Sequence, residues 1–138
     1  MIKIIETKPD DPRLQAVEDG LTAFNQEKNF PRANPRPFSL IATDNDGNVT
    51  GGLIAKEHFR WLHISVVYSV NKKQGLGRQL MQAAETYAQK EGLKGLTLTT
   101  FEFQAPGFYE KLGFEKIGVI PNYIQDQDRF YYCKRLQN

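Results

Sequence analysis

A short run of glycine and basic residues, Lys72-Lys73-Gln74-Gly75-Leu76-Gly77-Arg78, has the composition of an anion-binding turn. An apolar run from Trp61 to Val70 precedes it, and an amphipathic pattern from Leu76 to about Glu91 follows it. Where a strand passes through a glycine turn into a helix, the first backbone N–H groups are unpaired and the helix dipole favours negative charge. The run therefore predicts a pyrophosphate-binding turn, with the alternative that the glycines only let the chain turn sharply.

The other residues with distinctive chemistry exclude several kinds of site. The two histidines, His58 and His63, lie in different local contexts, and Cys133 is the single cysteine. We therefore expect no metal site and no internal disulfide. The glycine turn lacks the Gly-Lys-Ser/Thr of a nucleotide P-loop and the third glycine of a dinucleotide fingerprint, which excludes both motifs.

Length and charge indicate one domain spanning residues 1–138. A net charge of +2 is too small to indicate a nucleic-acid or membrane partner. No run approaches the roughly 20 apolar residues that span a bilayer, and the start is charged too soon for a signal peptide. We therefore expect a soluble cytoplasmic protein.

The elements that position the glycine turn follow from periodicity. Isoleucines in the first five residues suggest a short strand, and Asp11 before Pro12 indicates the N-cap of a helix that runs to about Lys28. Three prolines then exclude regular structure from residues 29–37. The remaining expected elements are a hairpin over 38–59, a central strand over 61–70, the helix that ends at Gly92, a strand over 96–101, a short helix over 106–112, an extended segment from Phe114 and a final strand over 130–136. Strand–helix–strand spacing implies a crossover to a parallel neighbour.

This order of elements, with a glycine turn after the central strand, resembles the GNAT superfamily of acyl-CoA-dependent N-acetyltransferases. The family's phosphate turn reads Arg/Gln-x-x-Gly-x-Gly/Ala, where this chain has Lys72 to Gly77. A second motif, Phe108-Tyr109-Glu110-Lys111-Leu112-Gly113-Phe114, is close to the family's aromatic-Tyr-x-Lys-Leu-Gly-Phe ending. The resemblance covers about residues 38–136. It implies an α/β fold with a mixed central sheet of about six to seven strands, splayed after the central strand and flanked by helices.

Three positions depart from the family pattern. Lys72 replaces the usual Arg or Gln, which keeps a charge but loses a planar donor fork. Tyr68-Ser69 stands where Asp-Pro is frequent, and Gln104-Ala105 stands where many members have Asn. None of these changes removes the backbone donors that a phosphate needs.

The resemblance implies that acetyl-CoA is the co-substrate. Its pyrophosphate would bind the N–H groups of residues 74–78, and its pantetheine arm would pair with the backbone near Val66 and Val67. The complete set of residues expected to bind the coenzyme is Val66, Val67, Lys72, Lys73, Gln74, Gly75, Leu76, Gly77, Arg78, Gln104, Phe108 and Lys111.

The resemblance also implies that Tyr109 is the general acid, because acetyl transfer releases a thiolate that a positioned phenol can protonate. The alternative is that Tyr109 is one more aromatic residue on an apolar helix face. The general base is not fixed by the pattern. Glu57, at the end of the hairpin, and His63, on the central strand, are two candidates, although a lone histidine in an apolar strand is more often a hydrogen-bonded core residue.

The expected acceptor is a primary amine of a small molecule or peptide. It would bind between the first helix with its proline-rich loop and the segment Asn122 to Asp128, where Asp126 and Asp128 can attract a cation beside Tyr123. A solvated charge cluster is the plainer interpretation of these acids. The rival function is a non-catalytic acyl-CoA-binding sensor or interaction module, and the aromatic content leaves room for an exposed homodimer patch.

Overall fold

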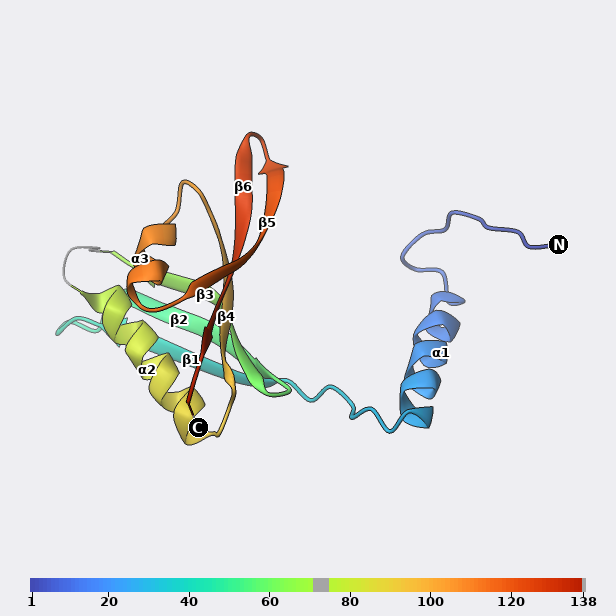
Figure 1. The fold of residues 1–138 in the computed structure, drawn as a ribbon, viewed down its shortest axis with the longest axis horizontal. Helices are drawn as coiled ribbons and strands as arrows, with labels where there is room; N and C mark the ends of the chain where they lie inside the picture. Colours follow the sequence, from blue (N-terminus) through green and yellow to red (C-terminus); the bar gives the residue numbers. More distant parts are fainter. Residues whose placement is uncertain (71–74, 138) are drawn as a thin grey trace. The chain divides into compact units, whose positions relative to one another are not determined.

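The computed structural model describes residues 1–70 and 75–137 (Figure 1). The predicted coenzyme residues Lys72, Lys73 and Gln74 lie outside this described part of the chain. The chain divides into two compact units, Met1–Ala33 and Asn34–Asn138. No helix in the described residues is long and apolar enough to cross a membrane.

The first unit contains helix α1, Leu14–Glu27. Asp11 lies two residues before the assigned capping position, Arg13, and its carboxylate accepts the backbone N–H of Arg13 at 2.9 Å, which is the bond expected of the predicted cap. The predicted strand at the isoleucines of residues 2–5 is wrong. A strand needs a hydrogen-bonded neighbour, and no strand among the described residues pairs with this segment, which is extended but irregular.

The second unit is a six-stranded mixed sheet in the order β1-β2-β3-β4-β6-β5. The strands are β1 Arg36–Thr43, β2 Val49–His58, β3 Trp61–Ser69, β4 Gly95–Phe101, β5 Glu115–Ile124 and β6 Gln127–Arg135. Helix α2, Leu76–Lys90, joins β3 to its parallel neighbour β4, and the short helix α3, Pro106–Lys111, follows β4. The predicted hairpin, crossover and short helix are therefore confirmed.

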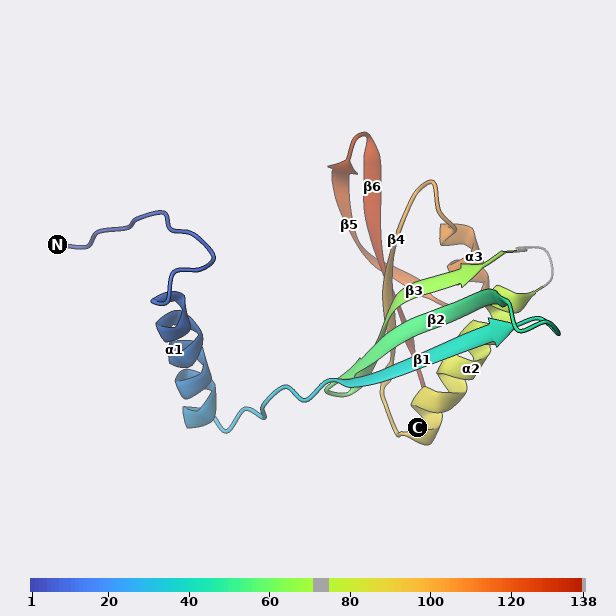
Figure 2. The ribbon, with the colours of Figure 1, turned by 180° about the vertical axis from the view of Figure 1, so that it is seen from behind.

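Helix α2 covers one face of β2, β3 and β4 and closes the core on that side. Figure 2, seen from behind, shows β1, β2 and β3 in front of this helix. The buried side chains come from the facing strands, from α2 and from Tyr132 of β6, which has no exposed surface. Gly92 ends the helix with a φ of 72°, as the sequence predicts.

A β-bulge at Ser65 changes the direction of side chains along β3. Ile54 of β2 pairs with Val66 while Ala55 pairs with Ile64, so Ser65 is an extra residue on β3. Before the bulge, Ile64 faces α2; after it, Val67 faces α2 and Val66 points to the opposite face with 45% of its surface exposed. Regular alternation along the strand would put Val66 on the same face as Ile64, and the bulge reverses this.

The sheet opens between β3 and β4, as the family resemblance implied. Their parallel ladder runs from the pair Trp61–Gly95 only to the pair Ile64–Leu98. Beyond that point β3 continues to Ser69 beside β2, whereas β4 continues to Phe101 beside β6. The result is a gap whose β3 edge pairs with no other described strand, and Figure 1 shows β3 and β4 running in different directions beyond their shared part.

Candidate active site

The start of α2 presents unpaired backbone donors beside the gap. Gly75 has a φ of 75°, a conformation that favours glycine, and its carbonyl accepts the N–H of Gln79 at 3.1 Å. No side chain caps the helix among the described residues, and its first turn carries no acidic residue. Gln79 is thus the first N–H donor within the helix, and the N–H groups of Leu76, Gly77 and Arg78, which precede it, have no acceptor within the helix and are available to an anion.

The two sequence motifs meet in space at Gly77 and Phe108. A Cβ atom placed on Gly77 would lie 3.3 Å from Cζ of the Phe108 ring. On the other side of the turn, a Cβ atom on Gly51 would lie 2.8 Å from Cδ2 of Leu76. These glycines are needed because α2, α3 and β2 approach one another closely around the turn.

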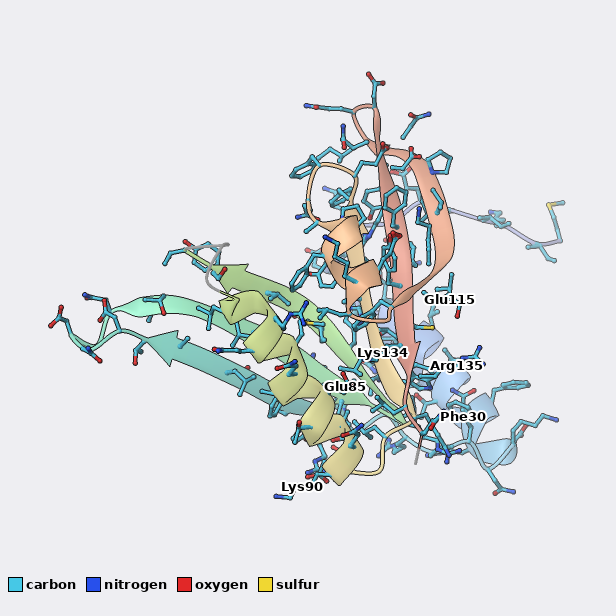
Figure 3. All side chains as sticks on the ribbon, turned by 60° about the vertical axis from the view of Figure 1, so that its left-hand side comes forward. Phe30, Glu85, Lys90, Glu115, Lys134 and Arg135 are labelled. Atoms are coloured by element: carbon cyan, nitrogen blue, oxygen red, sulfur yellow. The ribbon has the colours of Figure 1, made fainter. Side chains whose placement is uncertain are left out.

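A cavity of about 220 Å³ lies between α2 and α3 and brings together two predicted coenzyme residues, Arg78 and Lys111. Its wall is fixed by Lys134, whose Nζ donates to Glu85 of α2 at 2.9 Å and to the carbonyl of Leu112 at 2.8 Å (Figure 3). This single ammonium group sets the spacing of the two helices. Arg78 of α2 and Lys111 of α3 therefore both line this cavity.

Tyr109 lies on α3 in an aromatic cluster on the α2 face of the sheet. Its ring centroid is 5.1 Å from that of Phe108, 6.0 Å from that of Phe114 and 6.5 Å from that of Tyr132. Burial raises the pKa of the Tyr109 phenol, so the group keeps its proton at neutral pH. Among the described residues the hydroxyl has no hydrogen-bond partner, so its proton is free for another acceptor.

Gln104 has a local structural contact that the sequence did not indicate. Its side-chain carbonyl accepts the hydroxyl of Thr100 at 3.0 Å and the backbone N–H of Phe101 at 2.9 Å. These bonds hold the turn between β4 and α3. The side-chain amide donors remain available for a ligand.

His63 lies on the face of β3 opposite α2. Its Nδ1 is 2.9 Å from the Thr97 hydroxyl of the neighbouring strand. Partial burial, and then the positive charge of Arg129 with a smaller contribution from His58, lower the pKa of His63. The imidazole is therefore neutral at pH 7, the form that can accept a proton.

Glu57 lies at the other end of α2 from the glycine turn. Its carboxylate accepts the hydroxyl of Tyr87 at 3.1 Å and is 3.6 Å from the guanidinium of Arg36. Tyr87 also stacks on Phe38, with ring centroids 3.9 Å apart. Because Tyr87 is eleven residues after Leu76, about 16 Å of helix separates Glu57 from the turn, and the structure does not bring this base candidate to the gap.

The expected acceptor segment is shorter than predicted. β5 runs to Ile124 and β6 begins at Gln127, so only a tight turn remains between them. The Asp128 carboxylate accepts the backbone N–H of Asn122 at 3.1 Å, and the N–H of Asp128 donates to Glu102 at 2.8 Å. Asp128 is thus engaged in holding this hairpin against the segment after β4.

Sequence reasoning missed a set of polar residues opposite α2. Paired residues of neighbouring strands share a face, and Thr97, Thr99 and Phe101 of β4 pair with Cys133, Tyr131 and Arg129 of β6. Arg129 donates to Tyr123 and to Thr99. Only alternation within each strand could have pointed to this face, because its members lie far apart in the sequence. In the described part of the chain, no group of three acidic, histidine or cysteine residues could hold a metal ion.

Comparison with known proteins identifies the family. The model of the Acetyltransferase (GNAT) family matches residues 5–114, which span both units. The blasticidin-S acetyltransferase of Streptomyces morookaense is 34% identical over 119 residues, covering 81% of this chain and 88% of the relative.

Solved structures agree with this match. An acetyltransferase from Bacillus cereus ATCC 14579 is 25% identical with a TM-score of 0.84, covering 97% of this chain and 98% of that one. A Bacillus anthracis acetyltransferase in complex with acetyl coenzyme A has the same fold at 22% identity and a TM-score of 0.62, covering 80% of this chain and 68% of that one. The chain belongs to the GNAT family and is an acyl-CoA-dependent acetyltransferase.

Proposed function

We propose that the protein transfers the acetyl group of acetyl-CoA to a primary amine by direct attack in a ternary complex. The observation that carries the proposal is the gap between β3 and β4, whose open edge of β3 leads to the unpaired N–H groups of α2. A pyrophosphate on these N–H groups and a pantetheine arm along β3 fit that arrangement. The acetyl coenzyme A bound to the Bacillus anthracis structure supports the choice of donor.

In the proposed reaction, two residues act from opposite faces of the sheet. The amine nitrogen attacks the thioester carbonyl carbon, so a C–N bond forms and the C–S bond breaks. His63 accepts the proton that the amine loses, directly or through water, and the Tyr109 hydroxyl gives its proton to the departing thiolate. Backbone N–H groups on the open edge of β3, with Val67 the first candidate, polarise the carbonyl.

The neutral imidazole and the protonated phenol support these roles. The pKa of His63 is lowered, so it is ready to accept a proton, and the pKa of Tyr109 is raised, so it is ready to donate one. Groups with pKa values displaced in opposite directions around one opening are typical of acid and base pairs. Glu57 is left out of the proposal because Tyr87 and Arg36 already engage it.

The acceptor class is proposed from the relatives. Blasticidin S is the first compound to test, because the Streptomyces morookaense relative carries that activity in its name. The experiment measures release of free coenzyme A thiol from acetyl-CoA with blasticidin S and with a panel of amines and peptides, and measures acetyl-CoA binding by calorimetry. Binding together with turnover on at least one amine is expected. Tight binding with no turnover on any acceptor would contradict the proposal and favour a sensor.

A further inference from the structure

Arg129 is a half-buried cation that is held by hydroxyl groups and aromatic rings. From the start of β6, its Nη1 donates to the Tyr123 hydroxyl at 2.6 Å and its Nη2 donates to the Thr99 hydroxyl at 3.1 Å. Its guanidinium carbon lies 4.7 Å from the centre of the Tyr123 ring and 5.5 Å from that of the Tyr131 ring. These contacts fix the position of the guanidinium but do not balance its charge.

No carboxylate among residues 1–70 and 75–137 forms an ion pair with Arg129. Asp128, the residue before Arg129, accepts the backbone N–H of Asn122. Glu102, which follows the β4 partner of Arg129, accepts the N–H of Asp128. The Nε atom of Arg129 is moreover buried and has no hydrogen-bond partner in the same residues. A buried donor and an unbalanced charge are both unfavourable unless a ligand satisfies them.

The position of Arg129 connects it with the gap. Arg129 of β6 pairs with Phe101 of β4 and donates a hydrogen bond to Thr99. Thr99 is the first residue of β4 beyond the last β3–β4 pair. Arg129 lies on the face opposite α2, the face that carries His63, and its charge contributes to the lowered pKa of that imidazole. The guanidinium and the proposed base therefore lie on the same face of the sheet, near the end of the β3–β4 ladder.

We propose that Arg129 binds a carboxylate of the acceptor, so that the acceptor is an amine that also carries a free carboxyl group. Two of its five N–H groups are used by Tyr123 and Thr99, which leaves one further N–H on Nη1 and one on Nη2 that no described residue uses. Two neighbouring N–H groups of a guanidinium match the two oxygens of a planar carboxylate. A single fixed cation also suits a single negative charge. That the bound molecule is the acceptor rests on the proposed function, but carboxylate binding itself can be measured without turnover.

The test uses product-like probes with and without the carboxylate. N-acetylglycine and N-acetyl-β-alanine are each titrated against their carboxamides, with coenzyme A present, while the Arg129 Nε–H signal is followed by ¹H–¹⁵N NMR. We expect the carboxylates to shift this signal and to bind about tenfold more tightly than the amides, because a charged acceptor strengthens the hydrogen bonds. Equal binding of acids and amides, or no change in the signal, would overturn the inference.

Variants separate binding from stability. Arg129→Gln should reduce the acid-to-amide preference to nearly one, Arg129→Lys should keep part of it, and Tyr123→Phe should weaken it by releasing the guanidinium. Arg135→Gln removes the same charge from an exposed position on the same strand and should leave the preference intact. A purely structural Arg129 would instead lower the melting temperature in Arg129→Gln and leave the acid-to-amide ratio unchanged.

Turnover distinguishes the two proposals. Transfer only to amines without a carboxyl group, with no carboxylate-induced shift, would contradict this inference and leave the acetyltransferase mechanism intact. Carboxylate binding at Arg129 without transfer to any amine would support this inference and contradict the proposed acetyl transfer.

Discussion

The two sides of the gap in the sheet present different kinds of chemical group. On the α2 side, the groups that face the opening are backbone N–H donors of the first helical turn, glycines that allow close approach, and the phenol of Tyr109. On the opposite side they are side chains of three strands, among them His63, Thr99 and Arg129. Every residue except proline carries a backbone N–H, so most substitutions leave these donors in place, whereas strand side chains can be exchanged without altering the sheet.

This difference explains how one fold could keep the same acetyl donor and change its amine acceptor. In the proposed mechanism, the coenzyme side depends on the path of the chain, which the helix and the glycines fix. The acceptor side depends on the identity of a few outward-facing residues, and the same scaffold can therefore serve many substrates. The predictions below test whether the two sides are in fact independent.

The largest expected effect is that of Tyr109→Phe. Loss of a general acid should lower kcat by about 10²- to 10⁴-fold. The dissociation constant of acetyl-CoA should change less than about twofold, because the coenzyme side relies on backbone donors. Steady-state kinetics and calorimetry provide the two measurements.

Tyr132→Phe is the matched control for that variant. It removes another phenol of the same cluster, whose hydroxyl donates to Glu110 at 3.4 Å. We expect nearly unchanged kcat in this variant. Similar losses of activity in both variants would show that the cluster acts only through packing.

His63→Gln should lower kcat/KM by about 10²-fold at neutral pH, since the amide cannot accept a proton from the amine. Because the pKa of His63 is lowered from 6.5, only the neutral base is present above that pH, and activity should fall on acidification through a pKa below 6.5. The pH profile of the variant should lack this acidic fall in activity.

Arg129→Gln, with His63 present, should move the acidic fall in activity to higher pH. The reason is that removal of a nearby positive charge raises the pKa of His63.

Gly77→Ala should weaken acetyl-CoA binding by about tenfold, since the added methyl group meets the Phe108 ring at 3.3 Å and displaces the helix start or the ring. The KM of the amine should not change. Gly107→Ala is the control, because a Cβ atom there meets no atom within 4 Å. If the amine KM rose as well in Gly77→Ala, the two sides of the gap would not be independent.

The smallest effect is expected for Glu57→Gln. The amide can still accept the Tyr87 hydroxyl but no longer forms an ion pair with Arg36, so thermal unfolding should show a loss of about 1 kcal/mol or less. Turnover should remain within about twofold of the original, because Glu57 takes no part in the proposed chemistry. A loss of turnover like that of His63→Gln would assign the base to Glu57.

The elements of the coenzyme side could be predicted because each is contiguous in sequence. The glycine turn, the helix that follows it and the motif around Tyr109 are local patterns, and the structure confirms α2 and α3 where they were expected. The gap followed from the family resemblance and is confirmed by the short β3–β4 ladder.

The acceptor side could not be predicted in the same way. The contact of Arg129 with Thr99 joins residues thirty positions apart, and it depends on the register between β4 and β6. The face on which the Val66 side chain lies depends on the bulge at Ser65. No residue type predicts that bulge, because serine also occurs in regular strands. Local pattern fixes elements, while register and bulges decide which side chains share a face.

The bulge at Ser65 also bears on the solubility of the protein. An interior strand whose edge is left open can pair with a strand of another molecule and begin an aggregate, just as an outer strand can. At Ser65 the hydroxyl bonds the Ile54 carbonyl at 3.1 Å and the regular spacing of backbone groups along β3 is interrupted. The bulge thus also makes the exposed edge of β3 a poor template for another chain.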